Sequence, residues 1–112
     1  MKARIPGAPQ GGQAAMLQRL QDMQDQMQKT QEEVEATDFT ASVGGGVVEA
    51  TVTGAKVVKD IKISPEAIDP EEVEMLQDLV IAAVNEALRK AEDAMMQGME
   101  KAKGGLNIPG LF

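Results

Sequence analysis

The chain has 112 residues and a net charge of −7, and it contains neither cysteine nor histidine. Disulfides, thiol chemistry and histidine-based catalysis or zinc binding are therefore excluded, and an enzyme is not expected. With no apolar run of membrane-spanning length and no signal peptide, we expect one soluble cytoplasmic domain without cofactor, metal or small-molecule substrate.

The N-terminal third predicts a tail followed by a long helix. Residues 1–12 contain two prolines and three glycines, which predicts a flexible basic tail. Residues 13–36 contain neither, are rich in helix formers, and predict a helix. Its apolar positions recur every three or four residues and fall within a stripe of about 80°: Met16, Leu20, Met23, Met27, Thr30 and Val34. So narrow a stripe is typical of a coiled-coil seam, so we expect part of the helix to pack on another chain.

Residues 39–63 predict a three-stranded antiparallel meander. Apolar and polar residues alternate in 39–43 and 47–53, and the glycines at 44–46 supply a turn with positive φ. Gly54-Ala55 predicts a two-residue type II′ hairpin turn with glycine in the first position. In the third strand, Lys59 interrupts the apolar face, which indicates either an edge position or a bulge.

A second long helix is predicted from Asp69 to about Lys103. Asp69 is the predicted N-cap, Pro70 the first helical residue and Glu72 part of a capping box. Met75 and Leu79 lie almost opposite the main apolar face, which favours a partner there. The sequence leaves open whether the apolar segment 106–112 docks or stays mobile. The predicted fold is thus α+β, helix–three strands–helix, as a homodimer with these candidate interface residues: Met16, Leu20, Met23, Met27, Val34, Met75 and Leu79.

Two other sequence features favour ordinary structure. The three glycines join strand to strand and lack a following Gly-Lys-Ser/Thr, so a hairpin turn is favoured over a phosphate loop. The carboxylates of residues 66–78 have no calcium-loop spacing, and acidic residues at a helix start already stabilise the helix dipole. No metal site is expected.

Charge is distributed unevenly along the chain. Residues 1–31 sum to +2, residues 64–88 to −7 and residues 89–112 to +1. Scattered surface lysines are usually only solvated, but segregation of the positive charges to the helices and tail favours contact with a polyanion. The candidate residues for this contact are Lys2, Arg4, Arg19, Lys29, Arg89, Lys90, Lys101 and Lys103.

Five segments of the chain together match one known pattern: VGGGVVEATVTG at 43–54, IKISP at 61–65, EMLQDLV at 74–80, AAVNEA at 82–87 and GGLNIPGLF at 104–112. With these segments the sequence resembles the YbaB/EbfC family of bacterial nucleoid-associated proteins. The resemblance implies a single domain over residues 13–112, a helix–three strands–helix fold, a tweezer-shaped homodimer and DNA binding in the nucleoid. Relatives often carry a basic residue near Glu49, so that position is a poor candidate here.

Two functions follow from these observations. The first is a nucleoid-associated homodimer that binds duplex DNA, largely through phosphates and with weak sequence preference. The alternative is a non-enzymatic dimer that binds a partner protein through its Met-rich helical surfaces, with DNA contact incidental. The acidic middle of the chain favours the alternative, whereas charge segregation and the family resemblance favour DNA.

Overall fold

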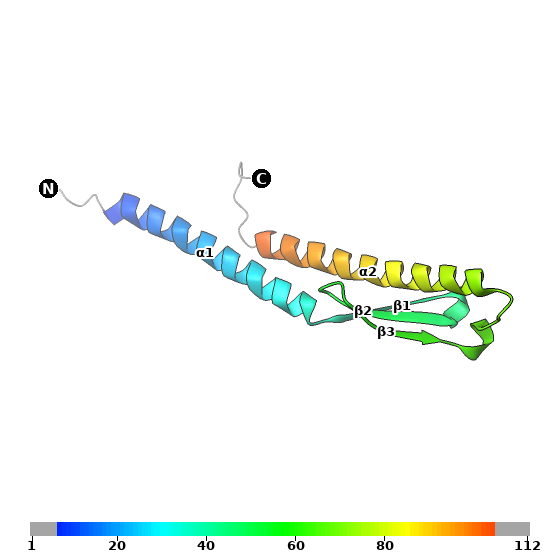
Figure 1. The fold of residues 1–112 in the computed structure, drawn as a ribbon. Helices are drawn as coiled ribbons and strands as arrows, with labels where there is room; N and C mark the ends of the chain where they lie inside the picture. The colour runs from blue at the N-terminus through cyan, green and yellow to red at the C-terminus, as the bar shows by residue number, and fades with distance from the viewer. Residues whose placement is uncertain (1–6, 105–112) are drawn as a thin grey trace.

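The structure is a computed structural model that describes the backbone of residues 7–104 and the side chains from Gly12 onward. Helix α1 (Gly7–Glu35) is followed by strands β1 (Asp38–Val43), β2 (Val48–Thr53) and β3 (Val58–Ile63), and then by helix α2 (Val73–Gly104) (Figure 1). Short 3-10 helices, η1 (Gly44–Gly46) and η2 (Pro65–Ala67), lie between elements. The predicted order of helix, three strands and helix is confirmed.

Helix α1 begins six residues before the predicted start at residue 13. Pro9 is its third residue, where the backbone N–H would have no acceptor within the helix, so proline is tolerated there. Residues 7–12 are therefore helical where the sequence predicted a tail, and residues 1–6 of that tail lie outside the described part of the chain.

The sheet has the strand order β1-β2-β3, with both pairs antiparallel. One face is apolar and packs under α2, which crosses β1 and β2. The fully covered residues of this core are Ala41, Val48, Ala50, Val52, Ala83, Ala87 and Ala91. Val48 and Val52 are the largest fully buried side chains within residues 12–104, so the chain buries little apolar volume by itself.

The first turn uses glycine as predicted. Gly44, Gly45 and Gly46 have φ values of 64°, 73° and 95°, a region that side chains with a Cβ rarely adopt. They form η1 and return the chain so that Val43 pairs with Val48.

The second turn differs from the predicted type II′ hairpin. The Lys56 amide donates to the Thr53 carbonyl at 2.9 Å, and the residue with positive φ is Lys56, at 67°, not Gly54. The connection is therefore a three-residue loop whose last residue is left-handed, a common alternative to the two-residue turn. Farther along, Val52 pairs with Val58 and Thr51 with Asp60, so Lys59 is the extra residue of a bulge on an edge strand.

We expect Lys56→Gly to raise the free energy of unfolding by up to about 1 kcal/mol, because glycine avoids the left-handed Cβ clash. The substitution also removes the ion pair between the Lys56 ammonium and the Glu92 carboxylate, which are 3.6 Å apart. Both side chains are exposed, so this pair contributes little to stability. Thermal denaturation should show a rise of a few degrees. Ala55→Gly, at the preceding residue, should lower the melting temperature instead, and a rise in both variants would contradict this explanation.

The start of α2 lies at Val73, so the predicted capping arrangement is wrong. The Asp69 carboxylate accepts the Glu71 amide at 3.0 Å, and the Asp69 carbonyl accepts the Glu72 amide at 2.9 Å. These bonds build a turn with Pro70 in its second position, where its fixed φ fits well. Glu72 then accepts the Leu76 amide at 3.3 Å and is the residue from which the helix starts.

Helices α1 and α2 run antiparallel and pack together along the C-terminal halves of both (Figure 1). The contact is close at Gly98, where an added Cβ would lie 2.7 Å from the Thr30 methyl carbon. The N-terminal half of α1 continues beyond the end of α2 (Figure 1). The molecule therefore has a sheet end, where α2 begins, and an arm end, where α1 begins and α2 ends.

Candidate nucleic-acid interface

The arm end carries the predicted basic residues of α1. Arg19 and Lys29 are both exposed, and they lie about 15 Å apart along the helix axis and about 80° apart around it. Neither belongs to the ion pairs within the described side chains, which are Lys56–Glu92, Lys59–Asp38 and Arg89–Glu86. Their charges are therefore available to a phosphate. The full helix, however, has only these two basic side chains against five acidic ones, a net charge of −3.

Lys101 and Lys103 lie in the last turn of α2, beside the arm. Basic side chains there are favoured by the negative end of the helix dipole. Lys101 borders a shallow hollow together with Gln26 and Glu33 of α1, on the flank of α1 that also carries Arg19 and Lys29. The fold thus brings Lys101 toward the α1 cations, whereas Lys103 lies about 160° away around α2.

Arg89 and Lys90 are engaged within the chain. The Arg89 guanidinium donates from Nη1 to both carboxylate oxygens of Glu86, at 2.8 and 3.0 Å. The Lys90 ammonium donates to the Thr40 carbonyl at 2.8 Å, which ties α2 to β1. These two residues are therefore weaker candidates than Arg19, Lys29 and Lys101. Lys2 and Arg4 lie outside the described residues.

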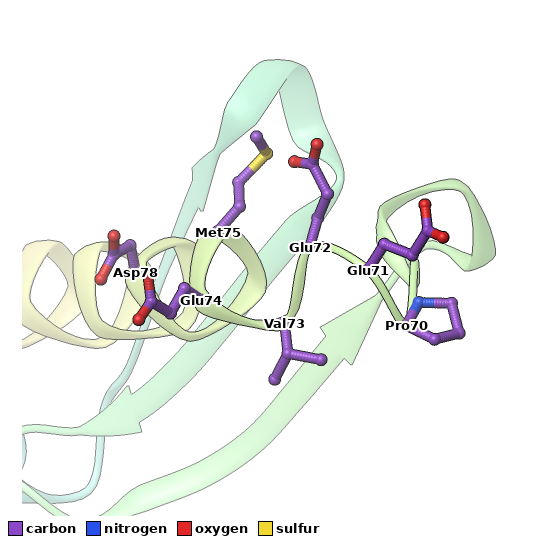
Figure 2. A pocket seen from close by; sticks show the side chains of 7 residues that line it. All are labelled: Pro70, Glu71, Glu72, Val73, Glu74, Met75 and Asp78. Atoms are coloured by element: carbon purple, nitrogen blue, oxygen red, sulfur yellow. The ribbon is translucent and has the colours of Figure 1, made fainter.

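A cluster of carboxylates with no basic residue among them lies at the opposite, sheet end. Figure 2 shows Glu71, Glu72, Glu74 and Asp78 around an open hollow where α2 begins. The described side chains contain no group of three or more carboxylates arranged to hold a metal ion. These acidic residues flank the positive N-terminus of α2, the role the sequence predicted for them.

Comparison with known proteins assigns the family. The model of the YbaB/EbfC DNA-binding family matches residues 10–106. The chain belongs to this family. It is 51% identical over 110 residues to a nucleoid-associated protein of Clostridium acetobutylicum, covering 98% of each chain. It is 50% identical over 101 residues to a nucleoid-associated protein of Listeria monocytogenes, covering 90% of this chain and 96% of the relative.

A solved structure supports the fold of this family member. The crystal structure of an uncharacterized Helicobacter pylori protein superposes with a TM-score of 0.58 at 23% identity, covering 70% of this chain and 90% of that one. Within residues 7–104, neither helix combines the length and apolarity needed to cross a membrane.

Part of the apolar seam predicted as a dimer interface is used inside the chain. Thr30 and Val34 face Gly98 of α2, and Met23 and Met27 are half-buried. On α2, Leu79 packs beside Gly44 in the same chain, whereas Met75 is exposed. Only Met16, Leu20 and Met75 therefore remain largely open among the predicted interface residues.

A second apolar surface was not among the sequence predictions. Val58 and Ile61 lie opposite Val52 and Ala50, so they belong to the apolar face of the sheet, yet they are 45% and 37% exposed because α2 does not cover β3. The flank of α2 toward β3 is marked by the Lys56–Glu92 ion pair. Ile81 lies about 20° from Glu92 around this helix and is 57% exposed. Val84 and Leu88 are half-buried and lie about 60° and 20° from Ile81 around the same helix. We define the β3 surface as Val58, Ile61, Ile81, Val84 and Leu88. The sequence signal was the apolar third strand, but which strand α2 leaves uncovered depends on tertiary packing.

Proposed function

We propose that this family member binds duplex DNA as a nucleoid-associated homodimer, mainly through phosphates and without enzymatic activity. The observation that carries the proposal is that Arg19 and Lys29 on the arm belong to none of the ion pairs within the described side chains, while the cluster of carboxylates at the start of α2 lies at the far end of the molecule. Glu74 and Lys101 are 27 residues apart on α2, about 40 Å along its axis. Since the Debye length is about 8 Å at physiological salt, the carboxylates at the start of α2 hardly weaken phosphate binding at the arm. The five carboxylates of α1 lie much closer to its two cations and should keep the affinity modest.

Weak base discrimination follows from the same arrangement. Reading base edges requires several side chains that enter a groove together. Arg19, Lys29 and Lys101 instead form a sparse strip along one flank of the arm. Such a strip suits the regularly spaced phosphates of a duplex and offers little to distinguish one base pair from another.

The test is a binding titration on unrelated duplexes at several salt concentrations. If each chain neutralises two or three phosphates, the dimer should give a log–log slope of roughly −4 to −5. Arg19→Gln with Lys29→Gln should weaken binding about tenfold or more at low salt and flatten the slope to between about 0 and −2, equally across sequences.

Lys56→Gln with Lys59→Gln is the matched control, since it removes two cations that are already paired with carboxylates. This variant should bind nearly as tightly as the unchanged protein. Equal weakening in both variants would contradict the arm as the contact site. If the unchanged protein binds no duplex even at low salt, the protein-interaction function takes the place of DNA binding.

The dimer part of the proposal rests on the small core and the β3 surface. A core of alanines and two valines leaves large apolar side chains uncovered, and a chain of this size gains much by burying them against a second copy. β3 is also an edge strand, and edge strands favour further pairing or coverage. We infer that two copies meet through the β3 surface, which leaves both arms free for DNA.

A further inference from the structure

The apolar stripe of α1 is only half covered by α2. Thr30 and Val34, at its C-terminal end, lie against Gly98. Toward the N-terminus, the same face carries Met16 and Leu20, which are 45% and 39% exposed, with Leu17 beside them at 66%. An apolar face on the arm therefore continues past the end of the helix that covers it.

The chain leaves α2 beside this uncovered face. Ala102 is only 7% exposed, and it lines the same hollow as Gln26 and Thr30 of α1. Because the two helices are antiparallel, Lys103 and Gly104 continue from Ala102 toward the start of α1. Helix α2 ends at Gly104, near the level of Met23.

The following segment has the length and chemistry to cover the stripe. Residues 105–112 (GLNIPGLF) include four large apolar side chains and no ionisable side chain. Eight extended residues reach about 26 Å, whereas Met23 and Met16 are only about 10 Å apart along α1. Pro109 cannot prolong α2, since it has no backbone N–H to donate. Burying these side chains costs no charge desolvation.

We propose that residues 105–112 pack along Met16, Leu20 and Met23 of their own α1 and complete the helix pair beyond the end of α2. The segment thereby covers the apolar flank of the arm and leaves the Arg19 and Lys29 flank open. This contact depends neither on DNA binding nor on assembly through the β3 surface.

A disulfide between two introduced cysteines tests the proposal, because the natural chain has none. Leu20→Cys with Ile108→Cys should oxidise to a cross-linked species of single-chain mass, with a yield that is unchanged by dilution. Gln18→Cys with Ile108→Cys is the matched control, since Gln18 is exposed and lies about 160° from Leu20 around α1. Its yield should be at least about fivefold lower. The proposal would be overturned by equal yields in the two variants or by the absence of any cross-link. A product of twice the chain mass would also overturn it, because it would show that a second copy covers the stripe.

Methionine oxidation gives an independent measurement without cysteines. Removing residues 105–112 should raise the rate of Met16 oxidation by peroxide several-fold, as followed by mass spectrometry. Met75 is 57% exposed at the sheet end and serves as the internal control. It should oxidise at the same rate in the full-length and the truncated protein. An unchanged Met16 rate would count against the docked segment.

Discussion

Alanine at Gly54 is expected to lower the free energy of unfolding by about 3 kcal/mol and the melting temperature by about 10 °C. The cause is contact with α1. A Cβ on Gly54 would lie 2.5 Å from the Val34 carbonyl carbon and would overlap the attached oxygen. The Gly54 amide also donates to the Thr37 carbonyl at 3.0 Å, so the loop cannot move away without losing this bond. Thermal and denaturant unfolding followed by circular dichroism would measure the loss.

Gly12→Ala is the control for this substitution. Gly12 lies in α1 with open space around it, and alanine there should stabilise the helix by about 0.5–1 kcal/mol. The same chemical change is thus expected to have opposite signs at the two sites. A Gly54→Ala protein as stable as the unchanged chain would mean that α1 does not approach the β2–β3 loop.

Local sequence signals predicted most of the fold. Alternation gave β1 and β2 with the correct buried residues, because Val48, Ala50 and Val52 follow the strand period. The first turn was also predicted, because glycine adopts positive φ readily wherever it occurs and three glycines stand together there. Gly54, by contrast, was predicted as glycine because of the turn conformation. In the structure glycine is needed there because a side chain would collide with the backbone of Val34, twenty residues earlier. No local pattern encodes that approach.

The ends of the helices were less predictable. Asp69 and Pro70 have the residue types of a helix start, but those types also build a β-turn, and the structure uses them for the turn before Val73. At α1, proline and glycine indicated a tail, although a proline in the first turn of a helix interrupts no hydrogen bond.

The candidate site was predicted by charge alone, and charge does not reveal which cations are already paired. The sequence could not distinguish Arg89, held by Glu86, and Lys90, held by a carbonyl of β1, from Arg19 and Lys29. Nor could helical periodicity separate the part of the α1 stripe that packs on α2 from the part that remains open. The Lys90–Thr40 bond and the α1–α2 packing join residues far apart in the chain, whereas Arg89 and Glu86 are three residues apart on one helix, a spacing at which side chains can pair.

Ile81→Glu is expected to weaken the proposed dimer by roughly a thousandfold. Burying one carboxylate in the β3 surface without a partner should cost about 2 kcal/mol or more. Twofold symmetry places one such carboxylate on each copy, so the dimer loses about 4 kcal/mol in total. A loss of about 4 kcal/mol raises the dissociation constant roughly a thousandfold. Ile81 is 57% exposed in the single chain, so the chain itself should still fold.

Met96→Glu is the matched control, because Met96 is 60% exposed on the same helix but lies about 60° farther around it, away from β3. Sedimentation over a range of micromolar concentrations should find the Ile81→Glu protein as a folded single chain and the Met96→Glu protein as a dimer. If Ile81→Glu remains a dimer while Met96→Glu dissociates, two copies meet on the outer face of α2 and the β3 surface is not the interface.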